Sequence, residues 1–301
     1  MMRNQRTIKR EITFKGIGLH TGVEAVVTLK PAPRDSGIVF YRRDRKTYIP
    51  ATILNICDTA FATTLTHNGV KIRTVEHILS ALSALGIDNI IIDVIGPEIP
   101  ILDGSAMLFV DLILDAGIAK QATQKPFIKI TRPFVYENNH STIACFPYNG
   151  QKISYSIDFN HSAIKHQEMT IELNEVNFIK EIAPARTFGF LKDVEALRAN
   201  GFAKGGNLDN AVVIDDSGVV NPSGLRFKNE FVRHKILDTI GDFALAGYPL
   251  IGHFVLNRSG HNSNTRFLSE LMSSKGYYTL TTSDSTFSLE SLYQEPYPQT
   301  V

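Results

Sequence analysis

Residues that can bind or orient a metal ion recur at every fourth position of the segment FKNEFVRHKILDTIGDFALAG. They are His234, Asp238 and Asp242. At about 100° per residue on a helix, their side chains point near 0°, 40° and 80°, and a stripe of apolar residues points to the opposite side. His234 and Asp238 could therefore chelate one metal ion, and Asp242 would orient a ligand. A salt-bridged surface helix is the alternative interpretation.

A second polar pair, Glu76 and His77, stands at the start of the apolar segment VEHILSALSAL. No charged residue follows at positions 78–87. A buried carboxylate and imidazole are costly without a partner, so this pair is not simply part of a solvated face. With His234 and Asp238, His77 would complete three N and O ligands around an open position, which is typical of catalytic rather than structural zinc.

Further polar residues stand at the ends of predicted elements or in Gly-flanked loops. Thr187 lies in PARTFGF, His261 in RSGHNSN and His20 in GIGLHTG. A Gly-flanked His often caps a turn, and we expect that role for His20. The loop of His261 directly follows the strand after the predicted metal-binding helix, so we expect His261 to contribute to the site.

Two predicted helices would position these residues. The first covers residues 75–85, with Thr74 as its N-cap and Gly86 as its C-terminal stop. The second covers about residues 229–246 and ends before Gly247. β-branched segments bounded by Gly or Pro predict strands at 23–29, 90–95, 127–135, 153–159 and 251–256.

Each half of the chain thus places a His near the start of a helix that runs through a Gly into a hydrophobic strand. This order predicts an α+β fold of two related α+β sandwich domains, with helices packed between sheets. We place the domains at residues 1–122 and 126–282, joined by the polar stretch KQATQK at 120–125. A βα-type insert is expected at about 190–216, and a flexible polar tail at 283–301.

The composition is that of an ordinary globular protein: of 301 residues, 43% are hydrophobic and 20% are charged. No apolar run approaches the ~20 residues that span a bilayer, and the basic N-terminus lacks the apolar segment of a signal peptide. We therefore expect a cytoplasmic protein. Cys57 and Cys145 fit neither a disulfide framework nor a thiolate zinc site, and we expect both to be buried.

The charge balance limits the classes of partner. A formal net charge of +1 argues against a general nucleic-acid-binding protein. Basic residues gather locally at 1–16 and at 41–46, where the sequence reads YRRDRK. We interpret both clusters as solvated surface, and peripheral attraction to anionic lipid headgroups of the inner membrane is the alternative.

Over nearly its whole length the chain resembles the UDP-3-O-acyl-N-acetylglucosamine deacetylases of lipid A synthesis in Gram-negative bacteria. The resemblance is carried by GIGLHTG, TVEHILSAL, IPILDGSA, ARTFGF, GGNLDNAVV, RFKNEFVRHKILDTIGD and GHNSNT. It implies hydrolysis of the N-acetyl group of a UDP-3-O-acyl-N-acetylglucosamine. It also implies one zinc ion per chain on His77, His234 and Asp238, with Fe²⁺ as the alternative metal in the cell. We expect a monomer.

The resemblance also implies the roles of individual residues. Glu76 would act as general base, and His261 as the acid and oxyanion stabiliser, oriented by Asp242. Thr187 would donate a hydrogen bond to the oxyanion, and Lys235 would contact the substrate. In such a reaction zinc polarises the amide, while separate acid and base groups give a bell-shaped dependence of rate on pH.

By the same resemblance, Phe188 and Phe159 would line the sugar and nucleotide region, and the insert would form a hydrophobic passage for the acyl chain. The residues expected to line this passage are Leu191, Val194, Leu208, Ala211 and Val213. A plain core role for these apolar residues is the alternative. Basic residues would meet the diphosphate, and the passage would bury CH₂ groups at about 0.8 kcal/mol each.

Two other classes of protein are weighed against this expectation. A peptidase or other amidohydrolase would also use zinc, but the sequence has no His-Glu-x-x-His motif. A sugar-nucleotide or lipid-binding protein would need no metal, so zinc content separates it from the enzymes. The sequence also lacks the Gly-rich motifs for nucleotide hydrolysis and dinucleotide redox chemistry.

Overall fold

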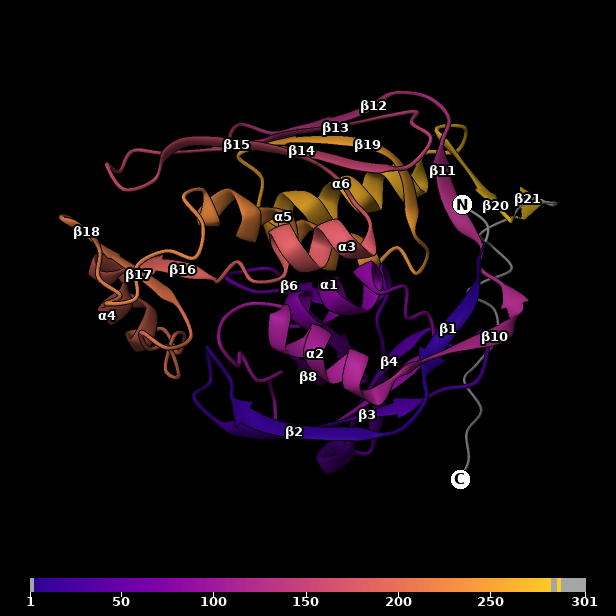
Figure 1. The fold of residues 1–301 in the computed structure, drawn as a ribbon, viewed down its shortest axis with the longest axis horizontal. Helices are drawn as coiled ribbons and strands as arrows, with labels where there is room; N and C mark the ends of the chain where they lie inside the picture. Colours follow the sequence, from indigo (N-terminus) through magenta and orange to yellow (C-terminus); the bar gives the residue numbers. More distant parts are fainter. Residues whose placement is uncertain (1–2, 283–285, 288–301) are drawn as a thin grey trace.

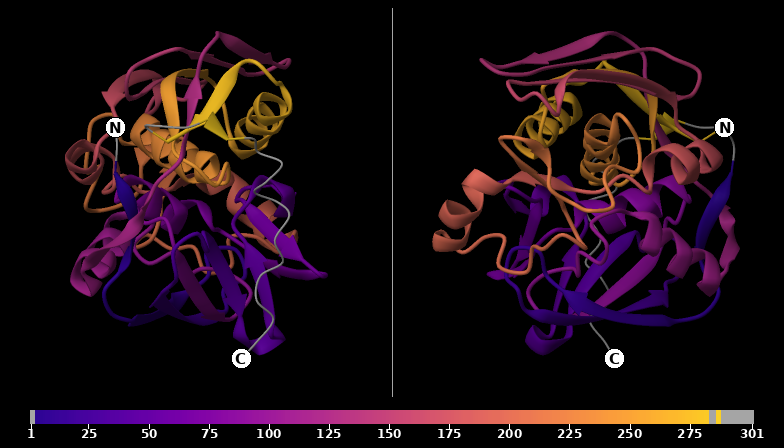
Figure 2. Two further views of the ribbon diagram at one scale, coloured as in Figure 1. Left: turned by 90° about the vertical axis from the view of Figure 1, so that its right-hand side faces the viewer. Right: turned by 60° about the vertical axis from the view of Figure 1, so that its left-hand side comes forward.

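The computed structural model describes residues 3–282 and 286–287 and has the form of a layered sandwich (Figure 1). A sheet from the second half of the chain lies at the top of Figure 1, and a sheet from the first half lies at the bottom. Helices fill the space between them, and the rotated views in Figure 2 show the same layers. The predicted α+β fold with helices packed between sheets is confirmed.

The first half forms the lower layers. Its elements are β1 (Asn4–Ile8), β2 (Ile12–Ile17), β3 (Glu24–Pro31), β4 (Ile38–Arg42), η1 (Arg43–Arg45), β5 (Thr47–Pro50), η2 (Ile53–Asn55), β6 (Ile56–Asp58), β7 (Thr64–His67), β8 (Val70–Ile72), α1 (Glu76–Ala84), β9 (Ile90–Ile95), α2 (Met107–Ala116) and β10 (Ile118–Gln124). The main sheet has the order β2-β3-β9-β4-β5. Burial alternates along β3 because one face of this sheet covers the core.

The second half forms the upper layers. Its elements are β11 (Phe127–Ile130), β12 (Phe134–Glu137), β13 (Thr142–Phe146), β14 (Gln151–Phe159), β15 (Lys165–Glu172), α3 (Glu175–Asn177), η3 (Phe178–Ile182), β16 (Phe188–Phe190), α4 (Leu191–Ala199), β17 (Val212–Asp215), β18 (Gly218–Val219), α5 (Glu230–Ala244), β19 (Leu250–Asn257), α6 (His261–Ser273), β20 (Tyr278–Thr281) and β21 (Thr286–Phe287). Strand β19 lies inside the large sheet: β13 and β14 pair with its two edges along residues 252–257, and β11 pairs with its first residues, Leu250 and Ile251.

The two halves share one order of elements. β9 pairs antiparallel with β3 and parallel with β4, just as β19 pairs antiparallel with β13 and parallel with β14. α1 precedes β9 as α5 precedes β19, and α2 or α6 follows. The relation between the halves that the sequence order predicts is therefore seen in the topology. The βα-type insert is seen as well, because α4 connects the parallel strands β16 and β17.

Two predictions about strands are wrong. Residues 120–125, predicted to be an irregular linker, lie mostly in β10, which pairs antiparallel with β1. The polar composition conceals this strand because its stability comes from backbone pairing with a distant segment. The single strand predicted at 127–135 is two strands, β11 and β12, which are separated near Pro133. A proline has no N–H to donate to a sheet.

Two predictions about single residues also need correction. Thr74 is not an N-cap, since α1 begins after Val75 with no side-chain cap, and the Thr74 hydroxyl donates to Glu98 instead. Cys57 is exposed, because the short strand β6 lies at the molecular surface, whereas Cys145 is buried as expected. Burial raises the pKa of the Cys145 thiol to about 12.

Among the described residues, no helix is long and apolar enough to cross a membrane. The predicted flexible tail at 283–301 falls outside the described residues, apart from the two residues of β21.

Candidate active site

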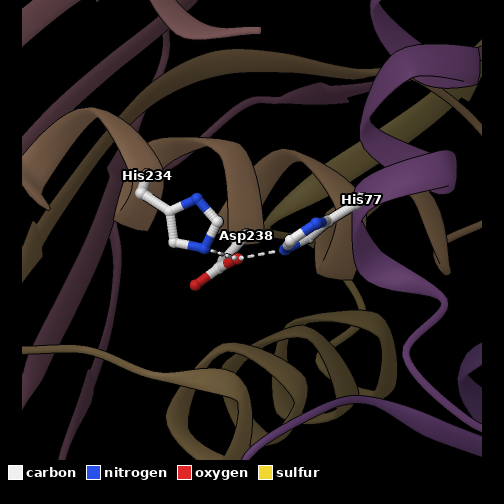
Figure 3. Close-up of side chains that lie close together, drawn as sticks. All are labelled: His77, His234 and Asp238. Carbon is white, nitrogen blue, oxygen red and sulfur yellow. Dashed lines mark ion pairs between the residues drawn. The ribbon is translucent and has the colours of Figure 1, made fainter. Parts of the chain in front are cut away.

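Two helices from different halves of the chain bring the three predicted metal ligands together. His77 comes from α1, and His234 and Asp238 come from successive turns of α5 (Figure 3). Their ligand atoms all lie within 4.8 Å of one another. Both imidazole Nε2 atoms face Asp238 Oδ1, at 3.6 Å from His77 and 3.3 Å from His234.

The two helices approach closely because Gly241 has no side chain. A Cβ atom at Gly241 would lie 2.0 Å from the backbone oxygen of Glu76. Apolar residues at helical spacing in α1 are fully buried, which holds its orientation against α5. The first turn of α1, with Glu76 and His77, is thereby fixed against the middle of α5.

The donor set fits a metal ion. Asp238 Oδ1 is buried and has no hydrogen-bond partner among the described residues. His234 Nδ1 lies 3.1 Å from the backbone oxygen of Ala185, which can only accept, so Nδ1 carries the proton and Nε2 keeps its lone pair. Two imidazole nitrogens and one carboxylate oxygen, with a further position open, form a ligand set that catalytic zinc accepts.

The charges around the cluster favour the protonation states that ligands need. Burial lowers the pKa of His234 to about 4, so its imidazole is neutral at neutral pH. Burial alone would raise the pKa of Asp238, but His234 and Lys235 hold it well below its usual range. Lys235 Nζ donates to Asp238 Oδ2 at 2.7 Å, and this ion pair outweighs burial and raises the pKa of Lys235.

Glu76 and His261 face one another beside the cluster. His261 Nε2 lies 3.8 Å from Glu76 Oε1 and 4.0 Å from Asp238 Oδ2. His261 Nδ1 donates to Asp242 Oδ2 at 2.9 Å, which leaves Nε2 directed at the pocket. Burial would lower the pKa of His261, but Asp242 raises it to about 9, whereas burial raises the pKa of Glu76. The Glu76 side chain and a positively charged imidazole therefore stand side by side.

Thr63 connects these two groups, although the sequence analysis did not identify it. Its backbone N–H donates to Glu76 Oε2 at 3.1 Å, and its hydroxyl donates to Asp242 Oδ1 at 2.6 Å. The Thr63 side chain is fully buried. Its position before a short strand in ATTLTH carries no local signal of this role, which arises only when the two halves meet.

A cavity of about 300 Å³ opens onto the cluster. Its lining includes Thr187 and Lys235, which were predicted to be catalytic, and Phe188 and Phe159, which were predicted to bind the substrate. The ring centroid of Phe188 lies 6.3 Å from that of His234 and 5.9 Å from that of Phe159. Aromatic side chains thus form one wall beside the predicted metal ligands, and Thr187 lines the same space.

A larger cavity of about 850 Å³ adjoins the first. The two share Phe159, Lys235 and Ser259 as lining residues. Lys165 adds positive charge to the larger cavity, where Arg258 forms an ion pair with Asp158. Basic side chains beside an aromatic wall form a surface that an anionic group with an attached ring can occupy.

The five residues predicted to line an acyl passage lie elsewhere in the insert. Leu191 is 48% exposed and Leu208 is 41% exposed. The other three, Val194, Ala211 and Val213, are half-buried. None of the five lines either of these two cavities, and their role in a passage stays a prediction.

His20 is buried and joins two segments. Its backbone N–H donates to Glu98 at 2.9 Å, and its Nδ1 accepts from the backbone N–H of Ala203 at 3.4 Å. The Gly-flanked turn that we expected His20 to cap is therefore attached to the insert on one side and to a buried carboxylate on the other.

Comparisons with known proteins agree with this geometry. Residues 5–273 match the family described as UDP-3-O-acyl N-acetylglycosamine deacetylase. A UDP-3-O-acyl-N-acetylglucosamine deacetylase of Thermodesulfovibrio yellowstonii is 54% identical, over 91% of this chain and 93% of its own length. Proteins of that name from Acidithiobacillus ferrooxidans and Legionella pneumophila (strain Corby) are 48% and 47% identical, covering 90% and 99% of both chains. The chain thus belongs to the UDP-3-O-acyl N-acetylglycosamine deacetylase family.

Proposed function

We propose that this protein hydrolyses the N-acetyl group of a UDP-3-O-acyl-N-acetylglucosamine and releases acetate, as a step of lipid A synthesis. The observation that carries the proposal is the convergence of His77, His234 and Asp238 beside Glu76 and His261. The proposed cofactor is one zinc ion per chain, with Fe²⁺ as the alternative in the cell. When bound, such an ion polarises the amide carbonyl and makes water more acidic.

Glu76 is the proposed general base. Its carboxylate accepts a proton from the attacking water, and the backbone N–H of Thr63 holds the second carboxylate oxygen at 3.1 Å. That hydrogen bond leaves Oε1 to face the pocket and His261. The base therefore has one oxygen fixed and the other available for the reaction.

His261 is the proposed acid. Its Nε2 proton is donated to the nitrogen of the departing amine, which would otherwise leave as an unstable anion. Asp242 binds Nδ1 and so keeps the imidazole ring in one orientation before and after the proton leaves Nε2. The Thr187 hydroxyl donates to the oxyanion of the tetrahedral intermediate, where the negative charge develops.

The two adjoining cavities suggest how the substrate lies. Phe188 and Phe159 would flank the sugar, which puts the acetamide next to Glu76. Lys235 reaches both cavities, and Lys165 lines the larger one, where the diphosphate and uridine would be held. The acyl chain would then leave on the side of the insert, along the five apolar residues named above.

Acetate release from a UDP-3-O-acyl-N-acetylglucosamine by the purified protein tests the proposal. We expect activity as isolated, loss after chelation, and recovery with about one equivalent of zinc. His77→Ala should abolish the recovery, whereas His67→Ala is a matched control because His67 is exposed in β7. Activity unaffected by chelation would contradict the metal, and a zinc-loaded protein inert on this substrate would indicate another amide hydrolase. Protein that retains no zinc would indicate a binding protein.

A further inference from the structure

Glu98 is a fully buried carboxylate that has no role in the proposed reaction. Oε1 accepts hydrogen bonds from the backbone N–H of His20 at 2.9 Å and from the Thr74 hydroxyl at 2.7 Å. Oε2 accepts from the backbone N–H and the hydroxyl of Thr21, both at 2.7 Å. A Cβ at Gly18 would lie 2.4 Å from Oε2, so a glycine is needed where the carboxylate enters the loop.

On one side, Glu98 holds the loop 18–22, which carries the insert. The backbone N–H groups of Lys204 and Gly205 donate to His20 and Leu19 of this loop at 3.2 and 3.0 Å. Two backbone hydrogen bonds therefore attach the Gly-rich turn of the insert to the loop. Any movement of the loop would shift that turn, and with it the side of the pocket that Leu19 lines.

On the other side, Glu98 holds the residue that leads into α1. Thr74 has φ of 56°, a left-handed conformation that is unfavourable for a β-branched residue. Such strain persists only where surrounding contacts over-determine it. The hydrogen bond from the Thr74 hydroxyl to Glu98 is such a contact, and it lies two residues before Glu76 and three before His77.

We infer that Glu98 is a positioning residue that couples the insert to the helix bearing the base and a metal ligand. One carboxylate oxygen sets the loop 18–22, and the other also fixes the backbone ahead of α1. The kinetic effects expected of this coupling rest on the proposed function. Its effect on zinc affinity can be measured without catalytic activity. If Glu98 only stabilised the fold, removing its contact with Thr74 and removing its contact with Thr21 would have the same effects on zinc affinity and on the kinetic constants.

We call the contacts of Glu98 with Thr74 and with Thr21 the clamp, with an α1 arm at Thr74 and a loop arm at Thr21. Two valine variants test these arms separately. Thr74→Val removes the hydroxyl at the α1 arm, and Thr21→Val removes the hydroxyl at the loop arm. Valine keeps the branched shape in both cases. Thr74→Ser and Thr21→Ser retain the hydroxyl and serve as the matched controls, and Glu98→Gln weakens both arms at once.

We expect the two arms to give different kinetic signatures. Thr74→Val should lower kcat about tenfold on acylated and non-acylated substrates with little change in KM. Thr21→Val should raise KM about fivefold for the acylated substrate only, with kcat unchanged. Each serine variant should restore the wild-type constants, and Glu98→Gln should show both effects.

Zinc affinity supplies a readout that needs no catalytic activity. Competition with a chelator should show about tenfold weaker zinc binding for Thr74→Val, because His77 loses its orientation, and unchanged binding for Thr21→Val. Wild-type protein that binds zinc but releases no acetate would contradict the proposed function and leave this test in place. The inference would be overturned if Thr74→Val and Thr21→Val had equal zinc affinities, or if the two variants showed the same changes in kcat and KM. It would also be overturned if both variants were only thermally destabilised, with wild-type zinc affinity and rates.

Discussion

Helices α1 and α4 have the same length of nine residues but lie in opposite environments. Seven residues of α1 are buried, Glu76 and His77 among them, whereas no residue of α4 is buried. Few buried contacts place an element at the low-stability end of a protein. The comparison shows that the predicted metal ligands are held by the core, while α4 is a surface element of the insert that can adapt to what it contacts.

The largest effect is expected from a ligand on the buried helix. His77→Ala should reduce acetate release by at least about 10³-fold, because charge stabilisation by the proposed metal ion would contribute several kcal/mol to the transition state. Metal content after dialysis and kcat would be measured together. Lys192→Ala on α4 is the control, and its rate should change by no more than about twofold, since Lys192 is exposed. An equal loss in both variants would remove the distinction between the helices.

The next effect concerns the orientation of His261, the proposed acid. Asp242→Asn keeps the shape of a side chain that binds both Thr63 and His261 but removes its charge. We expect kcat to fall about 10²-fold, the scale of a general acid's contribution. A kcat within about threefold of wild type would mean that His261 needs no such partner.

The effect of the same variant on the pKa of His261 can be measured without catalytic turnover. In chelated protein, the His261 imidazole should titrate with a pKa of about 9, as followed by NMR of its ring protons. Because this pKa is raised above the ordinary value of about 6.5, the stability that His261 contributes is fully present below pH ~6.5 and is lost as pH rises through about 9. Asp242→Asn should lower the pKa of His261, so that the stability it contributes is lost at a lower pH. An unchanged pKa would show that Asp242 is not its cause.

The site was predictable from sequence where local chemistry was unusual for its surroundings. Glu76 and His77 stand out because a charged pair opens an otherwise apolar helix, and His234 and Asp238 share one face of α5. The structure brings all four together. Periodicity and β-branched runs also predicted α1, α5 and the long strands β3, β9, β14 and β19, because one buried face per element leaves a regular pattern.

The remaining features depend on contacts between distant segments. Thr74 carries the N-cap signature of a helix, yet its hydroxyl donates to Glu98, so a tertiary contact overrides the local pattern. The polar segment of β10 gives no strand signal, because its partner β1 lies at the other end of the first half. Thr63 is likewise identifiable only once α1 and α6 are placed next to one another.

A smaller effect is expected from Thr63, which lies between Glu76 and His261, the proposed base and acid. Thr63→Val removes the hydroxyl that donates to Asp242 but keeps the backbone N–H that holds Glu76. We expect about a tenfold lower kcat, the scale of one lost hydrogen bond to a charged group, with thermal stability also reduced. Thr63→Ser should recover most of the rate. If serine fails to restore kcat, the methyl group rather than the hydroxyl is what the site needs.

The smallest effect is expected on the exposed helix. Leu191→Ala should change the free energy of unfolding by no more than about 0.5 kcal/mol, because Leu191 is 48% exposed and few contacts are lost. If the insert closes over the acyl chain, kcat/KM for the acylated substrate should still fall about fivefold, since buried CH₂ groups lose their partner. Leu54→Ala is the control, as Leu54 is 70% exposed outside the insert and should change neither quantity. A Leu191→Ala protein with unchanged kcat/KM for acylated substrate would assign Leu191 to ordinary surface. An equally large fall in kcat/KM for the non-acylated substrate would mean that Leu191 acts on the catalytic groups. In that case α4, like α1, would support the catalytic groups, and the contrast between the two helices would be lost.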